Sequence, residues 1–195
     1  MRVYAVYCHP DPSSFTSVVR QRAVDTLRTA GHEVRSSDLY ADGFEPTMSA
    51  TEVSEYLDAR PPSPEISSYC DSLTWCEALV LVYPTWWSGQ PAMLTGWLDR
   101  VLVRGVAWEL SESGSRVTGR LGNVRRLVTI TTHGSPRYIN LLEGETGRRV
   151  IGRALRVLCH SRARTIWLSL YNIDRATAEQ RHAFLDRVER RLQRL

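Results

Sequence analysis

The stretch ALVLVYPTWWSGQP, residues 78–91, decides the fold class. Its first six residues are apolar without alternation, which is typical of a central strand buried on both faces of a parallel sheet. Pro84 is expected to break this strand, and Pro91 is expected in the first turn of a helix over residues 91–103. Trp86 and Trp87 stand between them. The stretch therefore predicts a strand–loop–helix unit with aromatic side chains at the carboxyl end of the strand.

Strands and helices alternate on both sides of this unit. The apolar runs predict further strands over residues 3–7, 32–39, 125–131 and 164–170. Helical spacing and stop signals predict helices over residues 15–30, 51–57, 66–76 and 148–160, and a final amphipathic helix through Leu185, Val188, Leu192 and Leu195. Residues 105–122 show neither period and are expected to be irregular.

Five strands separated by helices specify an α/β fold with a parallel sheet covered on both faces. We expect a three-layer sandwich with the flavodoxin-like strand order 2-1-3-4-5, and a single domain over residues 1–195. Ligands of such sheets bind beyond the carboxyl ends of the strands. The loops over residues 8–16, 84–90 and 131–138 are therefore the candidate site.

Composition excludes several kinds of chemistry. All 25 basic residues are arginine, so neither a Walker-A lysine nor a Schiff-base lysine is available. The four cysteines form no Cys-x-x-Cys pair, and the Cys8-His9 and Cys159-His160 pairs lack zinc-finger spacing, so no metal site is expected. No apolar run is long enough to cross a bilayer and no signal-peptide core is present, so we expect a cytoplasmic protein without membrane insertion.

The first loop opens a helix and carries side chains that suit a phosphate. His9, Ser13, Ser14 and Thr16 are possible donors, and a helix start supplies unpaired N–H groups and a positive dipole end. The alternative is plain helix capping by Ser13 or Ser14. The loop has no Gly-x-Gly-x-x-Gly, so it is not a dinucleotide fingerprint.

The second and third loops suit a planar ring. Adjacent Trp86 and Trp87 cannot both pack into one core face, which favours an aromatic platform over the alternatives of a hydrophobic lid or a dimer contact. The third loop offers hydroxyls, an imidazole at His133, and Gly134, which permits close backbone approach. Alone, this third segment is equally consistent with a surface turn.

Arginine is concentrated in the second half of the chain. Residues 120–164 contain ten arginines and only two acidic residues, Glu143 and Glu145. The simpler interpretation of these arginines is a solvent-exposed basic face. The functional interpretation is electrostatic attraction of NADPH or nucleic acid. The net charge of +4 is modest, so we expect no nucleic-acid partner.

These loops together resemble those of the NAD(P)H:quinone oxidoreductase (DT-diaphorase-like) family of flavoproteins. The resemblance covers nearly the whole chain, and it rests on CHPDPSSF at residues 8–15, SDLY at 37–40, YPTWWSGQPAMLTGWLDRV at 83–101 and TTHGS at 131–135. It implies a flavodoxin-like fold, a bound flavin, NAD(P)H as co-substrate, a quinone-like electron acceptor and a homodimer.

The resemblance also implies site residues. By position, the phosphate end of the flavin would be held by His9, Ser14, Phe15 and Thr16. The ring would be lined by Pro84, Thr85, Trp86, Trp87 and Ser88, and its other edge closed by Thr131, Thr132, His133 and Gly134. Tyr138 would face the substrate, and Arg181 would lie near the adenine of a long cofactor. Stabilisation of developing charge would fall to Thr132, His133 or Tyr138.

The chain departs from the family pattern at several positions. Thr16 replaces an asparagine, His133 replaces a glycine, and no histidine stands near residues 142–144 where some members use one. Gly105 replaces an acidic residue of some FAD-binding members, which weakens the expectation of FAD relative to FMN. Residues 63–66, in contrast, match FAD-type members. The expected cofactor is FAD, with FMN as the alternative.

The expected activity is passage of hydride from nicotinamide to flavin N5 and on to a quinone-like acceptor, by a ping-pong mechanism. Two other functions remain open. The same site suits an azo- or nitro-compound reductase, because the rim of the pocket decides the acceptor. A flavin-binding regulatory subunit of a transporter or other partner is the alternative from another class.

Overall fold

A five-stranded parallel sheet forms the centre of the computed structural model, which describes residues 1–114 and 116–195. Its strand order is β2-β1-β3-β6-β7. The bounds are β1 Arg2–Tyr7, β2 Glu33–Asp38, β3 Ala78–Thr85, β6 Arg126–His133 and β7 Arg164–Leu170. Because β6 and β7 are the fourth and fifth strands of this sheet, the predicted order 2-1-3-4-5 is confirmed.

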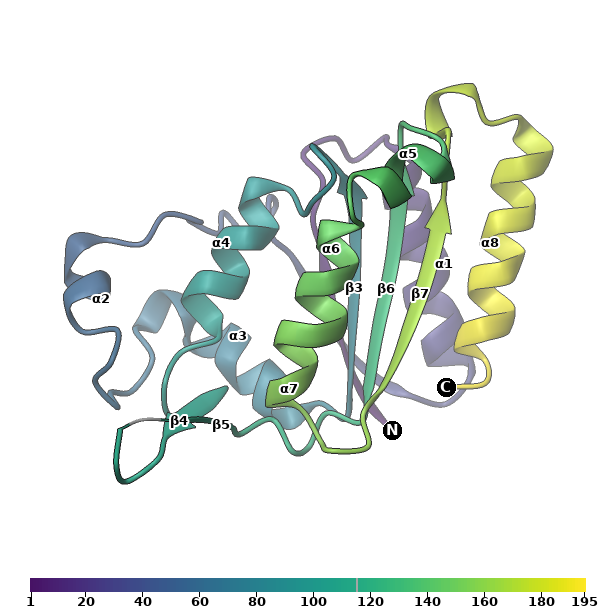
Figure 1. Ribbon diagram of the computed structural model, residues 1–195. Coiled ribbons are helices and arrows are strands. Elements are labelled where there is room, and N and C mark those ends of the chain that lie inside the picture. The colour runs from purple at the N-terminus through teal and green to yellow at the C-terminus, as the bar shows by residue number, and fades with distance from the viewer. Residues whose placement is uncertain (115) are drawn as a thin grey trace.

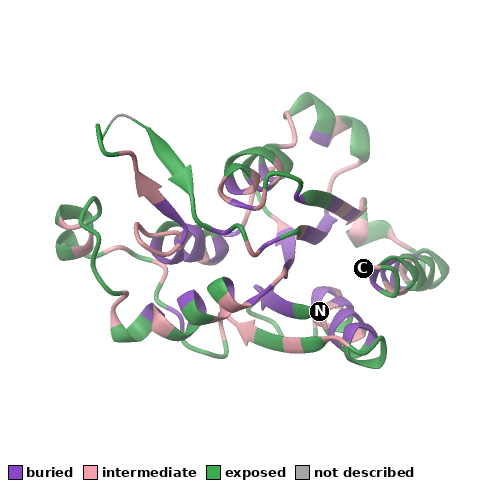
Figure 2. Ribbon diagram, turned by 90° about the horizontal axis from the view of Figure 1, so that it is seen from below, coloured by how far each residue is buried: buried purple, intermediate pink, exposed green. Residues whose placement is uncertain are grey.

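Helices cover both faces of the sheet (Figure 1). The first face carries α1 Phe15–Thr29 and α8 Ala178–Leu192, which pack with side chains such as Val80 and Ile130 into one apolar core. The second face carries α3 Pro64–Trp75, α4 Ala92–Val101, α6 Thr146–Arg149, the π-helical turn η1 Val150–Leu155 and α7 Arg156–Leu158. Figure 2 shows the buried residues gathered in the strands and on the inner sides of these helices.

The strand β3 does not end before Pro84, contrary to the sequence prediction. It continues to Thr85, with Pro84 opposite Thr132 of β6. The Val82 carbonyl accepts a hydrogen bond from Cys8 N–H at 3.0 Å, so by alternation the nitrogen of Pro84 also faces the β1 side. The β1–β3 ladder ends at the Tyr7–Val82 pair, so Pro84 lies beyond the last paired residue of β1, where a proline is tolerated.

Residues 105–122 are not irregular throughout, as the sequence suggested. They contain the antiparallel pair β4 Trp108–Leu110 and β5 Val117–Gly119. Three-residue strands are too short to show a period, so this hairpin was not predictable from the pattern. Gly119 allows the hairpin to pack directly against the backbone of Leu158, because a Cβ at position 119 would lie only 2.4 Å from Leu158 Cα.

Three short helices complete the structure: α2 Ala50–Ser54, α5 Arg137–Leu142 and the 3-10 turn η2 Ile173–Arg175. The last helix begins earlier than its apolar stripe suggested, because Thr177 and Gln180 form a capping box at its start. Among the described residues, no helix is both long enough and apolar enough to span a membrane.

Candidate functional site

The first loop ends in a helix start whose cap is made by Ser14. The Ser14 hydroxyl accepts a hydrogen bond from Ser17 N–H at 3.2 Å, which leaves the N–H groups of Phe15 and Thr16 without partners inside the helix. Ser13 takes no part in the cap, since its N–H and hydroxyl both donate to the exposed Asp11 carboxylate. These bonds hold the pKa of Asp11 below its usual range.

Thr16 connects the first loop to the third. It is buried, and its Oγ1 lies 3.5 Å from Oγ1 of Thr132 on β6. The His9 ring, in turn, lies 6.0 Å from the Trp86 ring, centroid to centroid. The fold thus brings the three predicted loops together at the carboxyl edge of β1, β3 and β6.

The second loop presents both tryptophans to solvent. Trp87 is fully exposed and Trp86 is 42% exposed. Trp87 and Ser88 have φ angles of 47° and 60°, a left-handed conformation that is unfavourable for residues other than glycine. Trp86 and Gly89 close the turn with two backbone hydrogen bonds of 3.2 and 3.0 Å. This loop is therefore a hydrogen-bonded turn that exposes two tryptophan side chains to solvent.

The tip of this turn is tied to the segment after β6. Ser88 Oγ donates a hydrogen bond to the Glu143 carboxylate, and the Thr146 hydroxyl donates to the Ser88 carbonyl. Two hollows flank the tryptophans. One of about 370 Å³ is lined by Thr85, Trp86, Trp87, Ser88, His133, Gly134, Ser135, Asn140 and Glu143. The other, of about 580 Å³, lies against α4 and the loop at Pro46 and Thr47.

The third segment belongs to β6 rather than to a loop. Thr131, Thr132 and His133 are its last residues and all three are buried, so the strand runs two residues beyond its predicted end at Thr131 and the loop begins only at Gly134. Thr131 Oγ1 lies 2.9 Å from Thr85 Oγ1 on the neighbouring strand. Gly134 is exposed, and a Cβ there would lie 3.0 Å from the Asp174 carboxylate.

His133 is held on two sides. Its Nδ1 lies 2.7 Å from Asn140 Oδ1, and its ring stacks on Tyr171 with centroids 4.6 Å apart and planes at 22°. Its Nε2 is buried and has no hydrogen-bond partner among the described residues. Burial lowers the pKa of His133, while the Asn140 bond and the nearby Glu145 and Glu143 charges oppose that shift. The imidazole is therefore neutral at pH 7.

Two predicted residues lie at the margins of the site. Tyr138, on α5, is 64% exposed and does not line the 370 Å³ hollow, to which α5 contributes Asn140 instead. Arg181, on α8, places its guanidinium 5.6 Å over the Phe15 ring and donates to the Ile173 carbonyl at 3.3 Å. Its Nε is buried without a partner in the described part of the chain. Arg181 therefore lies beside the start of α1.

Three residues of the site were not predicted from the sequence: Asn140, Glu143 and Tyr171. Each takes its role from a contact between segments, with His133 for Asn140 and Tyr171 and with Ser88 for Glu143. An amide seven residues after a strand-end histidine is too common a pattern to identify such a contact.

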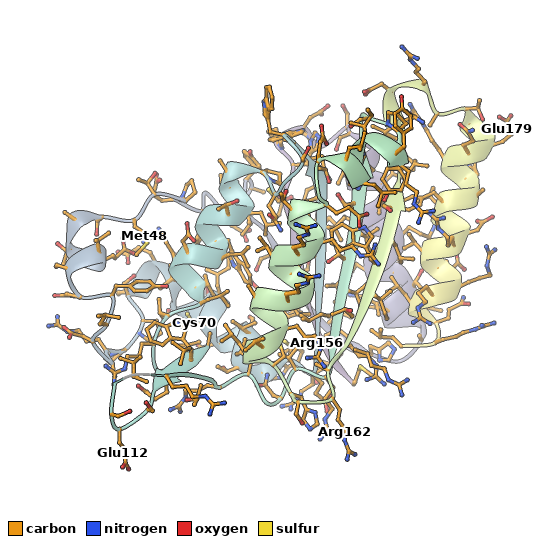
Figure 3. The ribbon with its side chains drawn as sticks, in the orientation of Figure 1. Met48, Cys70, Glu112, Arg156, Arg162 and Glu179 are labelled. Carbon is orange, nitrogen blue, oxygen red and sulfur yellow. The ribbon has the colours of Figure 1, made fainter. Side chains whose placement is uncertain are left out.

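The ten clustered arginines are mostly solvated and lie at both ends of the sheet. Eight of them are exposed, and Arg126 and Arg156 are intermediate. Arg126 and Arg164 begin β6 and β7 and so lie at the edge opposite the site. Figure 3 shows Arg156 and Arg162 at that same end, far below α5 of Figure 1. Arg137, Arg148, Arg149 and Arg153 lie on α5, α6 and η1, the helical segments between the carboxyl end of β6 and α7.

The structure gives little support for a reactive cysteine or a bound metal ion in this site. All four cysteines are buried and free, and burial raises the pKa of each to about 12, so none is a thiolate at neutral pH. The described residues contain no cluster of His, Cys, Asp and Glu that could hold a metal. What the site offers is a helix start for an anion, aromatic surface for a planar ring and a buried imidazole nitrogen that no described residue pairs.

Comparison with known proteins places the chain among relatives of the same fold. The family described as "Flavodoxin-like fold" matches residues 1–191. NAD(P)H dehydrogenase [quinone] 1 of Rattus norvegicus is 31% identical over 151 residues, which are 69% of this chain and 54% of the relative. The chain thus spans about half the length of this curated relative.

Solved structures of similar proteins have the same fold as this chain. The NAD(P)H:quinone oxidoreductase from Methanothermobacter marburgensis is 25% identical with a TM-score of 0.82, over 99% of this chain and 96% of that one. An FMN-dependent NADH-azoreductase from Bacillus anthracis, solved in complex with FMN, is 15% identical with a TM-score of 0.78, over 99% and 98%, and shares the fold. From its strand order, its family match and these neighbours, the chain belongs to the family of proteins with the flavodoxin-like fold.

Proposed function

We propose that this protein is a flavin-dependent NAD(P)H oxidoreductase that reduces quinone-like acceptors. The observation that carries the proposal is the meeting of three loops at one edge of the sheet, with the start of α1 beside the Trp86–Gly89 turn and His133. An anion-binding helix start next to an aromatic-lined hollow suits a phosphorylated planar ring. The quinone-reductase names of the rat and Methanothermobacter proteins support the same assignment.

In this proposal, one group of residues binds the phosphate end of the flavin and another group binds its ring. The N–H groups of Phe15 and Thr16, with Ser14 and His9, hold the phosphate. Thr85, Trp86, Trp87, Ser88, His133 and Gly134 line the hollow that would take the ring. Pro84, Thr131 and Thr132, buried near the ends of β3 and β6, would support it from the sheet. When bound, the flavin supplies hydride transfer between nicotinamide and acceptor. The chain orients the ring and keeps water from the buried hydroxyls of Thr131 and Thr132.

The proposed cofactor is FAD, with FMN as the alternative. Arg181 supports the longer cofactor, because its guanidinium lies at the phosphate end of the site and its buried Nε has no partner in the described residues. A diphosphate or adenine beside Phe15 would give this group an acceptor. Release of the cofactor from purified protein by heat, followed by chromatography against FAD and FMN standards, decides between the two.

We further propose a homodimer that covers the exposed tryptophans. A fully exposed Trp87 beside an exposed Trp86 is costly aromatic surface, and symmetric dimers are the commonest soluble assembly. The protein is then a dimer by light scattering at micromolar concentration. A monomer with full activity would contradict this part of the proposal.

Steady-state kinetics test the activity. NADH or NADPH and a simple benzoquinone would use one pocket in turn, so double-reciprocal plots are expected to be parallel, as in a ping-pong mechanism. Intersecting lines would indicate a ternary complex, and no flavin-dependent oxidation of either nucleotide would refute the proposal. The same assay with an azo dye measures the alternative activity suggested by the fold shared with the azoreductase.

A further inference from the structure

The side-chain amide of Asn140 faces two backbone carbonyl groups. Its Nδ2 lies 3.0 Å from the Pro136 carbonyl oxygen and 3.4 Å from the Ser135 carbonyl oxygen. Carbonyl oxygens only accept hydrogen bonds, so the atom facing them is the NH₂ group, and the orientation of the amide follows from this network. Asn140 Oδ1, an acceptor without a proton, is therefore the atom that faces His133.

This arrangement decides where the proton of His133 resides. The 2.7 Å contact between Nδ1 and Asn140 Oδ1 requires a donor, so Nδ1 carries the proton. In a neutral imidazole the other nitrogen, Nε2, is then a bare acceptor. Burial keeps the ring neutral; the acidic groups around it are Glu143 and Glu145, and Asp174 beside Gly134.

The acceptor has nothing to accept from within the described chain. One face of the ring is covered by Tyr171, one edge is used by Asn140, and Nε2 is buried without a partner. Buried polar atoms are rarely left in this state unless a ligand or ordered water completes them. His133 lines the 370 Å³ hollow beside Trp86 and Trp87, so a ligand in that hollow is the nearest source of a donor.

We propose that His133 accepts a hydrogen bond through Nε2 from a ring N–H of the bound flavin, and that Asn140 is the positioning residue that fixes this tautomer. The inference rests on the proposed flavin site and adds to it. It differs from the charge-stabilising role expected from sequence, because a donor to a developing anion would need the proton on Nε2. Nε2 is buried in this structure, so the contact forms only if the side chains over it move aside when the flavin binds.

The chemistry of the ring limits the possible donors. Oxidised isoalloxazine has one ring N–H, at N3, and the anionic reduced ring adds one at N5. A flavin methylated at N3 therefore separates the two. If N3 is the donor, the methylated FMN binds the wild-type protein more weakly than FMN but binds His133→Phe as FMN does. If N5 is the donor, methylation has no effect and His133→Phe weakens binding of the reduced flavin alone.

The tautomer itself is measured without flavin. In apoprotein labelled with ¹⁵N-histidine, the His133 resonances, identified by their loss in His133→Phe, are expected to show a protonated Nδ1 and an unprotonated Nε2. Asn140→Leu, which removes the acceptor for Nδ1, should lose this pattern. A protonated Nε2 in the wild-type protein would overturn the inference and leave the proposed function intact.

Affinity supplies the second readout. Losing one hydrogen bond in a partly buried site is expected to weaken binding of the donor-bearing flavin about 5- to 30-fold in His133→Phe. His133→Gln, whose amide oxygen can replace the Nε2 acceptor, should stay within about threefold. Equal affinities in His133→Phe and wild-type protein, for both oxidised and reduced flavin, would overturn the inference alone. A wild-type protein that binds no flavin would overturn the proposed function as well.

Discussion

The two ends of the parallel sheet differ in how completely their polar groups are paired. At the amino end, Asn123 donates to the carbonyls of Leu73 and Cys76 at 3.0 and 2.6 Å. There, too, the Glu77 carboxylate accepts from Arg2 N–H at 2.9 Å. At the carboxyl end, His133 Nε2 is buried without a partner in the described chain, and Trp87 is fully exposed.

This difference suggests that the amino end of the sheet contributes mainly to folding stability and the carboxyl end mainly to ligand binding. Left-handed backbone at a residue such as Trp87 or Ser88 and a buried unpaired acceptor each cost roughly 1–3 kcal/mol. The fold tolerates these costs at one edge because the two apolar cores and the paired amino end supply the stability. Substitutions at the amino end should therefore change the free energy of unfolding, and substitutions at the carboxyl end should change ligand affinity.

The largest effect is expected for Ser14→Asp at the start of α1. A carboxylate there would lie close to the flavin phosphate, and repulsion of about 1 to 4 kcal/mol lowers flavin affinity roughly five- to thousand-fold. The fold should survive, because Asp caps helices as well as Ser does. Flavin titration with circular dichroism measures both quantities, with Ser14→Thr as the matched control. An unchanged dissociation constant would show that Ser14 is only a helix cap.

The next effect is expected at the opposite end, for Asn123→Ala. This change leaves the Leu73 and Cys76 carbonyls without their shared donor, at a cost of about 1–3 kcal/mol in the free energy of unfolding. Urea unfolding should show this loss while the flavin dissociation constant stays at its wild-type value. Weaker flavin binding without lost stability would contradict the proposed separation of the two ends.

A smaller effect is expected for Trp87→Ala. Because the side chain is fully exposed within one protomer, the free energy of unfolding of the isolated protomer should change by less than about 0.5 kcal/mol, while the proposed dimer should dissociate more readily. Loss of an aromatic contact with the ring, worth about 0.5–1.5 kcal/mol, should weaken flavin binding about 2- to 12-fold. Val53→Ala, at another exposed apolar side chain, should change neither quantity. Destabilisation by Trp87→Ala without an effect on flavin would assign the side chain to packing.

The smallest effect concerns pH. The folded-state pKa of His133 is lowered below its ordinary value of 6.5, so the unfolded chain binds the proton more readily. Stability is therefore complete above pH 6.5 and falls as the pH drops below it. His133→Phe should reduce this dependence, as measured by urea midpoints between neutral and mildly acidic pH. The remaining dependence includes His32, whose pKa is also lowered.

Much of the fold was predictable because burial leaves a clear pattern. The continuous apolar run at the start of β3 indicated a central strand, and the alternation of five strands with helices favoured the flavodoxin-like sheet order. The site was predictable as three loops, since parallel strands share one carboxyl edge. Asn140, Tyr171 and Pro84 within β3 were not, because their places depend on contacts between segments that no local period encodes.

The visible spectrum and flavin titration of the purified protein test the central claim most directly. We expect a yellow protein, or colourless apoprotein that quenches the fluorescence of added FAD or FMN to a stoichiometric endpoint. The Ser14→Asp variant should remain folded and lose this binding, whereas Asn123→Ala should retain it. A colourless wild-type protein that quenches neither flavin would show that the carboxyl end of the sheet is not a flavin site.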